Sequence, residues 1–443
     1  MSAQKILHVL HNYPPEFRGG VERSVENAAR SQTKLGFEVR VVAGSETVLP
    51  DAERRDEIHE GVVVHRLYRG AGLRDPVDPF RADVAAPYES VLEEYRPDVV
   101  HVHHWTNLAD DLVRRAVRRG ARVVVTLHDF FATCALYFRI PDGRTPCDLP
   151  QSPEHCGPCI SRTLGIGEPE QVKIRVENRR LAFAEELRAA SVVTAPSRAH
   201  MRNLAAHLPS DLALEELPLG SEPLSPLPHV PRNGPLRVLH FGNLCRLKGV
   251  ELLADAVEAA DPGGAGIRLR LLGGVLEPDL RTGRGERVGG YSPETLRTEA
   301  AAADVAVFPS YARETYSFAV DEALRLGLPV LVSDRGAMPE RIGERGLALP
   351  AGDVSAFAAE LARMKADPER TAAMRRGIHV PLATRDEFGV RAAEIYARVI
   401  AMPPKAAALE ALHLRRLVQF ERTFGHFYQE LIRLKGLAGE GRA

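Results

Sequence analysis

The stretch FPSYARETYSFAVDE, residues 308–322, has a strand–loop–helix pattern that recurs along the rest of the chain. The β-branched and aromatic run Val305–Phe308 predicts a short buried strand that stops at the following Pro-Ser pair. From Ser317 onward apolar residues recur at helical spacing, and Gly327 predicts the end of that helix. A strand, a polar loop and a helix in this order are typical of an α/β protein with a parallel sheet.

Two carboxylates flank the predicted start of this helix. Glu314 lies in the loop before the helix, and Glu322 lies inside it. Between them, the first helical turn offers free backbone N–H groups and the positive end of the helix dipole, which suit a phosphate. A ligand with hydroxyls at both ends and phosphate between them, such as a nucleotide-sugar, fits this arrangement. Two glutamates at this spacing are also common on solvated helices. The choice between a binding role and simple solvation therefore depends on the rest of the sequence.

Length and composition bound the class of protein. A chain of 443 residues is too long for one core, which predicts two domains. The hydrophobic content of 44%, the charged content of 26% and the net charge of −1 are those of a globular protein with no general affinity for nucleic acid or anionic membranes. The sequence contains no apolar run of 18 residues and no signal-peptide pattern at its start. We therefore expect a cytoplasmic protein with no nucleic-acid partner.

The first half begins with a βαβ pattern. Lys5–Leu10 predicts a buried strand, a glycine-containing loop leads into a helix, and Phe37–Ala43 predicts the next strand. Gly19 and Gly20 at the head of that helix would let the backbone approach a phosphate closely, or they make only a tight turn. The dinucleotide fingerprint of three spaced glycines is absent, which counts against a dehydrogenase.

Strands and helices continue to alternate through the first half. The predicted strands are Val62–Leu67, Asp98–His103, Arg122–Leu127, Ser191–Pro196 and Leu212–Leu217, and the predicted helices are Phe80–Tyr95, Leu108–Arg119 and Glu170–Ala189. In such sheets ligands bind at the carboxyl ends of the strands. His128 and Asp129 follow one of these strands, whereas His101, His103 and His104 lie at the end of another. The pair His128-Asp129 is the better candidate for a substrate contact, and a structural role is the alternative for each histidine.

Four cysteines lie in a Pro- and Gly-rich insertion, residues 130–165, for which we predict little regular secondary structure. Cys134, Cys147, Cys156 and Cys159 follow the spacing C-x12-C-x8-C-x2-C. Four thiolates on one structural zinc ion would tether such an insertion, and independent thiols are the alternative. A catalytic zinc is disfavoured because no histidine or carboxylate occupies a matching position in the set.

A linker and a second α/β pattern follow. Six prolines between Pro218 and Pro235 exclude a helix or central strand, so residues 221–235 are the predicted interdomain linker. The predicted strands are then Leu236–Phe241, Ile267–Leu272, Pro329–Ser333 and Leu347–Pro350, the predicted helices are Val250–Ala260, Pro293–Ala303, 354–366 and 389–400, and 336–346 is a predicted loop. Lys248 and Arg246 precede one helix start, where cations strengthen anion binding; solvated side chains are the alternative. Residues 401–443 have apolar residues at helical intervals and predict a packing or dimer helix, hence a homo-oligomer.

Several segments together resemble the family-4 retaining glycosyltransferases of the GT-B fold. They are RGGVERSV, TLHDFFATC, FGNLCRLKG, DVAVFPSYARETYSFAVDEALRLGLPVLVSD and GAMPERI. The resemblance spans nearly residues 5–400. It implies two Rossmann-like domains facing across a cleft: an acceptor-binding domain at 1–220 and a nucleotide-sugar-binding domain at 236–400, with 401–443 as an added helical tail.

The resemblance also implies a role for each matching residue. Glu314 would hold hydroxyls of the donor sugar, Glu322 the ribose hydroxyls and Lys248 the diphosphate. Further implied contacts with diphosphate or sugar come from Gly19, Gly20, His128, Tyr316, Ser317 and Phe318. The family usually has Arg after the glycine that matches Gly242, and here that position is Asn243. Either the diphosphate is held more weakly, or Arg246 reaches it from a different turn.

The implied chemistry is sugar transfer with retention of configuration. In this family attack is thought to occur on the front face, while the leaving diphosphate oxygen accepts the proton of the acceptor. Cationic side chains and helix starts would stabilise the diphosphate, so no separate nucleophile and no cofactor are expected. The sequence has no DxD-type metal motif at the site. A saccharide, a lipid-linked acceptor and a small natural product all stay open, as do two other functions, a nucleotide-sugar epimerase and a catalytically silent binding subunit.

Overall fold

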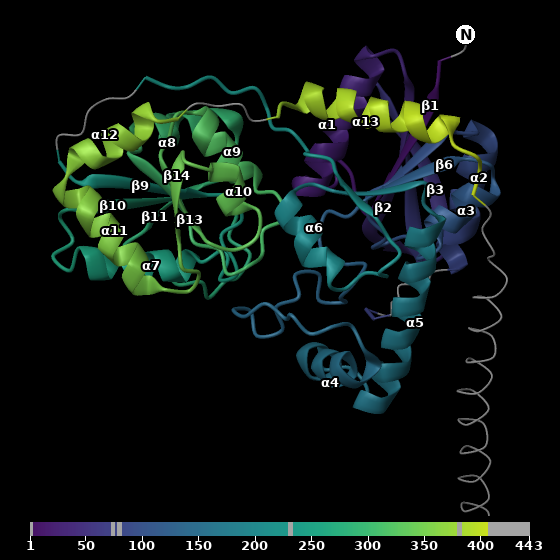
Figure 1. The fold of residues 1–443 in the computed structure, drawn as a ribbon, viewed down its shortest axis with the longest axis horizontal. Coiled ribbons are helices and arrows are strands. Elements are labelled where there is room, and N and C mark those ends of the chain that lie inside the picture. Colours follow the sequence, from purple (N-terminus) through teal and green to yellow (C-terminus); the bar gives the residue numbers. More distant parts are fainter. Residues whose placement is uncertain (1–2, 72–75, 78–81, 229–233, 379–382, 406–443) are drawn as a thin grey trace, which may run out of the picture.

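The computed structural model describes residues 3–71, 76–77, 82–228, 234–378 and 383–405, which form two sheets with helices packed around each (Figure 1). The strands of the first sheet are β1 (Lys5–Leu10), β2 (Glu38–Leu49), β3 (Glu53–His59), β4 (Val62–Gly70), β5 (Val99–Val102), β6 (Arg122–Thr126), β7 (Val192–Ala195) and β8 (Leu214–Glu216). Their spatial order is β3-β4-β2-β1-β5-β6-β7-β8, and only β3 runs antiparallel to its neighbour within this described sheet. The helices of this half are α1 (Gly20–Lys34), α2 (Ala82–Tyr95), α3 (Leu112–Arg118), α4 (Pro153–Leu164), α5 (Pro169–Ala189) and α6 (Arg198–Ala205).

The second sheet is parallel throughout its described strands. They are β9 (Leu236–Phe241), β10 (Ile267–Leu272), β11 (Glu286–Gly289), β12 (Val305–Phe308), β13 (Val330–Ser333) and β14 (Gly346–Leu349), in the spatial order β11-β10-β9-β12-β13-β14. The remaining helices are α7 (Val250–Ala260), α8 (Pro293–Ala302), α9 (Phe318–Arg325), α10 (Met338–Ile342), α11 (Val354–Ala366), α12 (Pro368–Arg376) and α13 (Arg385–Ala401). The predicted α/β fold with two Rossmann-like halves is confirmed.

The predicted secondary structure differs from the observed one mainly in elements whose sequence has no clear apolar pattern. Strand β3 was not predicted because its sequence, ERRDEIH, is almost entirely charged; as an edge strand it needs backbone pairing with β4 and no buried face. Helix α4 forms 12 residues near the end of the insertion that was predicted to have little regular structure, and α10 lies within the predicted loop 336–346. Helices α6 and α12 were also missed.

Helix α13 belongs to the first domain in space. The sequence grouped residues 389–400 with the second domain, but α13 packs along α1, where a Cβ on Gly389 would lie 2.0 Å from Oγ of Ser31 (Figure 1). Phe388 and Tyr396 of this helix are fully buried in the core of the first domain. Tyr316, from the loop before α9, is buried in the same core, so the site-forming loop of the second domain also rests on the first.

Within the described residues the chain crosses between the domains twice, and the two crossings pair with each other. The N–H of Ser221 donates to the carbonyl of Ala383 at 3.0 Å, and the N–H of Arg385 donates to the carbonyl of Ser221 at 3.1 Å. Gly220 has φ +67°, and a Cβ there would lie 2.1 Å from the carbonyl oxygen of Thr384. Only glycine therefore permits this close approach.

Two further predictions concern membrane-spanning helices and the C-terminal tail. No described helix combines the length and the apolar composition needed to cross a bilayer. The predicted helical tail at 401–443 lies outside the described residues from position 406 onward.

Candidate active site

The starts of α1 and α9 face each other across the domain boundary. Gly19 is the extended N-cap residue of α1, and a Cβ on Gly20 would lie 3.7 Å from the ring of Phe318, the first residue of α9. The free N-terminal N–H groups of two helices, and the positive ends of their dipoles, thus converge from different domains. Part of the α1 start is already capped, because the N–H of Gly19 donates to Oε2 of Glu22 at 2.9 Å.

The loop that leads into α9 is held in an unusual backbone conformation. Ser317 has φ +76° and ψ +80°, a left-handed conformation that costs a non-glycine residue about 1–3 kcal/mol. The first domain fixes this loop at two points. Oγ of Ser197 donates to the carbonyl of Thr315 at 2.8 Å, and the N–H of Gly220 donates to the hydroxyl of Tyr316 at 3.0 Å. Such strain persists only where the surroundings enforce it, which is typical of binding sites.

Lys248 and Glu314, both predicted to bind the donor, lie together. Nζ of Lys248 donates to both carboxylate oxygens of Glu314, at 2.7 and 2.8 Å, and Oγ of Ser310 donates to one of them at 2.6 Å. Gly249 allows the two loops to meet, because a Cβ there would lie 2.0 Å from the carbonyl oxygen of Pro309. The lysine side chain is 29% exposed and the glutamate 12%, so the ammonium remains accessible to a ligand.

Glu322 connects the two domains. Nη2 of Arg23, from α1, donates to Oε1 of Glu322 at 2.6 Å, and the hydroxyl of Tyr291 donates to the other carboxylate oxygen. Burial opposes the charge of Arg23, but Glu322 outweighs it and raises the arginine pKa; burial and Glu322 also raise the pKa of Tyr291. The sequence argument missed both partners, although Arg23 lies within the RGGVERSV segment.

The structure shows the surroundings of Arg246 and Asn243, the two positions at which the sequence left the binding of the diphosphate open. Arg246 forms ion pairs with Glu251 at 3.1 Å, Glu277 at 2.7 Å and Asp279 at 2.7 Å. Its charge is therefore engaged by three carboxylates in this conformation. Asn243 is exposed in the same loop.

His128 lies after β6 within a group of buried histidines. Its Nε2 is 2.9 Å from Nδ1 of His103, and burial lowers its pKa to about 3. The adjacent Asp129 accepts from His104 at 3.3 Å, and from the N–H of Phe131 at 2.8 Å. Burial works against ionisation of Asp129, but the charge and hydrogen bond of His104 lower its pKa overall. The carboxyl ends of β5 and β6 thus bring together the polar residues that the sequence placed there.

The four cysteines of the insertion line one small cavity. Cys134, Cys147, Cys156 and Cys159 all border it, and no disulfide joins them. Among the described residues, no three of these sulfur atoms lie within 4.8 Å of one another. The predicted structural zinc stays a prediction.

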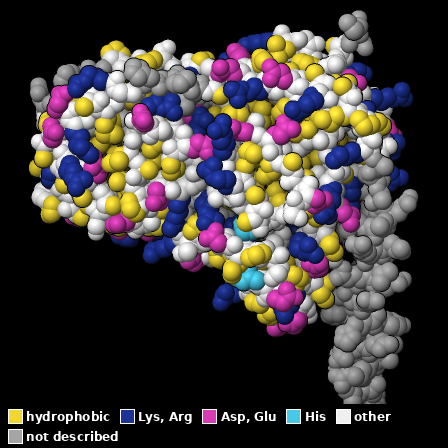
Figure 2. All heavy atoms as spheres, viewed as in Figure 1, with side chains coloured by type: hydrophobic (Ala, Val, Ile, Leu, Met, Phe, Trp, Pro, Cys, Tyr) yellow, Lys and Arg dark blue, Asp and Glu magenta, His cyan; other side chains and the backbone are white. Residues whose placement is uncertain are grey.

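The same insertion reaches the second domain beside the residues predicted to bind the donor. The carbonyl of Arg144 accepts from Arg335 at 2.9 Å, and Asp148 pairs with Arg313, the residue before Glu314, at 2.5 Å. Figure 2 shows Lys and Arg side chains gathered where the two domains meet on the face in view. An anionic ligand would meet favourable charge on approaching this boundary.

Comparisons with known proteins cover both halves of the chain. Residues 18–213 match the family model described as Glycosyltransferase Family 4, and residues 235–367 match the model described as Glycosyl transferases group 1. The D-inositol 3-phosphate glycosyltransferase of Thermobispora bispora is 25% identical, over 86% of this chain and 90% of that protein. An uncharacterized 42.6 kDa protein from the cps region of Klebsiella pneumoniae is 28% identical, but the match covers only 28% of this chain and 37% of that protein.

Solved structures share the two-domain architecture. Sucrose-phosphate synthase from Thermosynechococcus elongatus aligns with a TM-score of 0.60 and 18% identity, covering 90% of this chain and 99% of that one. The catalytic domain of starch synthase IV from Arabidopsis thaliana, bound to ADP and acarbose, aligns with a TM-score of 0.61 and 16% identity, covering 90% and 100%. At these identities the likeness concerns the fold. Because the two family models together cover most of the chain, at residues 18–213 and 235–367, the chain belongs to glycosyltransferase family 4, and its two sheets form the GT-B fold.

Proposed function

We propose that this glycosyltransferase moves a sugar from a nucleotide-diphosphate sugar to an acceptor with retention of the anomeric configuration. The observation that carries the proposal is that the starts of helices α1 and α9 converge between two ion pairs. Lys248 pairs with Glu314 on one side, and Arg23 pairs with Glu322 on the other. Among related solved structures, starch synthase IV from Arabidopsis thaliana is bound to ADP and Alr3699/HepE from Anabaena to UDP, which fits a diphosphate at this position.

Each part of such a donor has a matching group. Glu322, held by Arg23 and Tyr291, would accept hydrogen bonds from the ribose hydroxyls. The diphosphate would lie between the two helix starts beside Lys248, and Glu314 and His128 would contact the sugar. Hydroxyl groups of a bound sugar can replace Lys248 as hydrogen-bond donors to Glu314, which would turn the ammonium toward the phosphates.

The reaction then needs few groups from the protein. The bond between the anomeric carbon and the diphosphate oxygen breaks, its electron pair leaves with the diphosphate, and the acceptor oxygen bonds to the same carbon from the same face. The acceptor proton passes to the departing phosphate oxygen. Lys248 and the helix starts stabilise the charge that develops on the diphosphate, and closure of the domains excludes water. This role of cationic groups underlies the proposal that transfer needs no metal ion.

The proposal is tested by transfer assays with a panel of nucleotide-diphosphate sugars and simple acceptors. K248A and E322A should each lower transfer at least a hundredfold while the melting temperature stays near that of the wild type. The matched control is R188A, which removes an exposed arginine at the end of α5 that pairs with Asp211 within the first domain. Full activity in K248A or E322A would exclude the assignment.

Two further readouts of the same assay test the stereochemistry and the alternatives. NMR of the product should show the anomeric configuration of the donor, and EDTA should leave the rate unchanged. Inversion would overturn the retaining mechanism, whereas an epimerised sugar formed from donor alone would indicate an epimerase. A protein that binds the nucleotide but neither transfers the sugar to any acceptor nor hydrolyses the donor would be a binding subunit.

A further inference from the structure

A continuous chain of hydrogen bonds runs through the first domain to His128. Its members come from β6, β7, β5, α13, α1 and β1, although they are far apart in the sequence. In order, they are the carbonyl of Val125 and the side chains of Thr194, Thr126, His101, Tyr396, Gln32, His8, His103 and His128.

The first link fixes the direction of the chain, because a carbonyl oxygen can only accept. Thr194 must donate its single hydroxyl proton to Val125, at 3.2 Å. Thr126, 2.7 Å from the hydroxyl of Thr194, must therefore donate to it. Its own proton is then used, so Nε2 of His101, 2.7 Å away, must carry a proton and donate to Thr126.

The direction passes through Tyr396 to Gln32. Burial lowers the pKa of His101 well below its ordinary value, so the ring is neutral and its Nδ1 is an acceptor. Tyr396 must donate to this nitrogen, at 2.7 Å. Because the tyrosine proton is used, Gln32 must present its amide nitrogen to the tyrosine oxygen at 3.2 Å, which leaves the amide oxygen facing His8.

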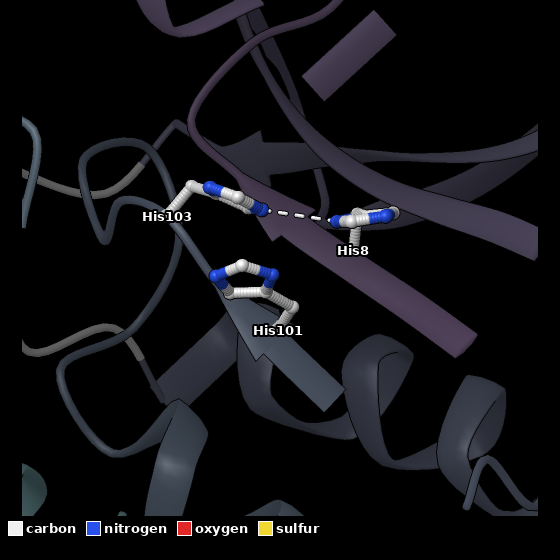
Figure 3. A group of neighbouring side chains, drawn as sticks. All are labelled: His8, His101 and His103. Atoms are coloured by element: carbon white, nitrogen blue, oxygen red, sulfur yellow. Dashed lines mark hydrogen bonds between the residues drawn. The ribbon is translucent and has the colours of Figure 1, made fainter. Parts of the chain in front are cut away.

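The last three links carry the same direction to His128. Nε2 of His8 donates to the Gln32 oxygen at 2.8 Å, so Nδ1 of His8 accepts from His103 at 3.0 Å (Figure 3). Nδ1 of His103 must then accept from Nε2 of His128 at 2.9 Å. Burial lowers the pKa of His8 to about 4, that of His128 to about 3, and that of His103 well below its ordinary value, so the three rings are neutral.

A metal ion is the competing explanation for these histidines. Ring nitrogens of His8, His101 and His103 lie within 4.8 Å of one another, as a metal site would require. All six nitrogens of the three rings already have hydrogen-bond partners, however. A metal would have to break several of these bonds, so the group is better explained as part of the chain.

We propose that this chain holds His128 as the tautomer protonated at Nε2, which makes its Nδ1 lone pair the ring's remaining hydrogen-bonding group. The substrate position that meets His128 must then be a hydrogen-bond donor, such as a hydroxyl or an amine. A fluorine or an ionised carboxylate at that position is rejected. This specificity rests on the proposed function, whereas the tautomer does not. Tyr396, Gln32, His8 and His103 are positioning residues, because they act on the substrate through His128.

NMR of the full-length protein labelled with ¹⁵N-histidine tests the tautomer directly. His128, assigned by loss of its signals in H128Q, should show a protonated Nε2 and a bare Nδ1 at pH 7.5. Y396F removes a hydroxyl that fixes the direction, so Gln32 can rotate and His128 should become a mixture of tautomers. Y95F is the matched control, because the buried Tyr95 hydroxyl donates to the carbonyl of Glu38 outside the chain. A protonated Nδ1 in the wild type would overturn the proposal.

Donor analogues test the specificity. Each sugar hydroxyl is replaced in turn by hydrogen and by fluorine, and binding to the wild type is measured. At one position both analogues should bind at least tenfold more weakly than the parent sugar, and this difference should shrink in Y396F but persist in Y95F. Binding of every fluorinated analogue as tightly as the parent would overturn the specificity. If no nucleotide-sugar binds at all, the proposed function fails while the tautomer measurement still stands.

The thiol-lined cavity carries a second, independent inference. Its volume is about 20 Å³, room for one water-sized guest, and its lining includes all four cysteines of the insertion. Cys156 and Cys159 lie one turn apart on α4. Donors already point at two of the sulfurs: the N–H of Leu136 is 3.4 Å from Cys134, and Nη2 of Arg139 is 4.0 Å from Cys147.

We infer that Cys134, Cys147, Cys156 and Cys159 bind one Zn²⁺ ion as thiolates. Tetrahedral coordination would place the sulfurs about 3.8 Å apart, closer than they lie here, so binding draws the side chains inward. Zinc binds cysteine as the thiolate, so each of the four thiols releases its proton when the ion binds. The ion would brace loop 139–149, which meets Arg313 and Arg335 of the second domain.

Metal analysis of the full-length protein, purified under reducing conditions with Zn²⁺ present and then dialysed, tests the site. We expect about one equivalent of zinc in the wild type and in C245S, since Cys245 is buried in the second domain. Each of C134S, C147S, C156S and C159S should bind less than half as much. Co²⁺ substitution of the wild type should add an intense sulfur-to-metal absorption band, which keeps the test decisive if a serine variant misfolds. Less than a third of an equivalent of zinc in the wild type would overturn the inference. So would a molecular mass lowered by the loss of thiol hydrogens, because it would show that the cysteines form disulfides.

Discussion

Arg23 of α1 and Glu322 of α9 form an ion pair 2.6 Å long that joins the two domains across the candidate active site. The side chain of Glu322 is only 4% exposed, so its charge depends on Arg23 and Tyr291 for stabilisation. A buried carboxylate left with fewer partners is costly. This pair therefore orders the residue proposed to bind the ribose, and it places a cation beside the start of α1.

Replacement of Arg23 by alanine should weaken binding of a nucleoside diphosphate about tenfold. A hydrogen bond to a charged group contributes about 1.5–3 kcal/mol, reduced here because Arg23 is 25% exposed. Isothermal titration calorimetry with ADP and UDP measures the change. R30A is the control, because Arg30 lies two turns along the same helix and pairs with Glu60 inside the first domain. Equal affinities in R23A and the wild type would show that the pair has no part in donor binding.

Introduction of arginine at Asn243 should strengthen donor binding several-fold. The position is exposed, so a longer side chain can be accommodated, and the charge of neighbouring Arg246 is engaged by three carboxylates. One added cation near a diphosphate contributes on the order of 1 kcal/mol. The dissociation constants of N243R and the uncharged control N243Q are compared at two ionic strengths. An N243R protein that binds no more tightly than N243Q would place residue 243 away from the diphosphate.

Removal of Glu340 should open the ligand-free protein. Its carboxylate, on α10, accepts the backbone N–H groups of Arg198 at 3.1 Å and Ala199 at 2.8 Å, where α6 of the other domain begins. Such a helix-start contact contributes about 1 kcal/mol, enough to change the ratio of closed to open molecules about fivefold. Small-angle X-ray scattering should show a larger radius of gyration for E340A. The exposed Glu344 provides the control E344A, and the same radius in both variants would contradict the expectation.

Acid should destabilise the protein partly through His240. Burial lowers the pKa of His240 to about 4, with a smaller contribution from the charge of Lys248, although Glu314 opposes it. Between pH 6.5 and 4 the unfolded chain binds a proton that the native ring does not, so the free energy of unfolding falls as the pH falls. His200 and His207, with pKa values of about 4, act in the same direction.

Scanning calorimetry at pH 7.5 and pH 5 measures this dependence. The melting temperature of H240Q should fall less between the two pH values than that of the wild type. The comparison at pH 7.5, where the ring is neutral in both states, gives the cost of the substitution itself. A pH dependence identical in both proteins would mean that His240 binds its proton equally well in the native state.

The fold was largely predictable because many of its buried strands are short apolar runs, and glycine or proline directly follows some of them, such as β9, β10 and β12. Strands β9, β10 and β12 and helices α7 and α11 begin and end where the sequence placed them. The edge strand β3 was not predictable in this way, because backbone pairing rather than burial holds it. The place of α13 on the first domain was also hidden, since an apolar helical pattern does not say which surface the helix covers.

The candidate site was predictable only as separate pieces. Gly20, Lys248 and Glu322 each lie at a helix start or inside a helix that follows a strand, so local pattern finds them. The pair between Arg23 and Glu322 joins residues 299 positions apart, which local pattern cannot reveal. Tyr396 is likewise far in sequence from the histidines whose hydrogen bonds it directs. The first pair depends on how the two domains meet, and the contacts of Tyr396 depend on the return of α13 to the core of the first domain.

The paired crossings at Ser221 and Thr384 limit how the domains can move. Two connections bonded side by side act as a hinge, whereas a single linker would leave one domain free to swivel and slide. The remaining low-cost motion is rotation about the axis through this pair, with Gly220 packed against Thr384 at the pivot. Such a rotation brings the starts of α1 and α9 together along one arc each time. The protein can therefore release its product and reassemble the same site without a search through other domain orientations.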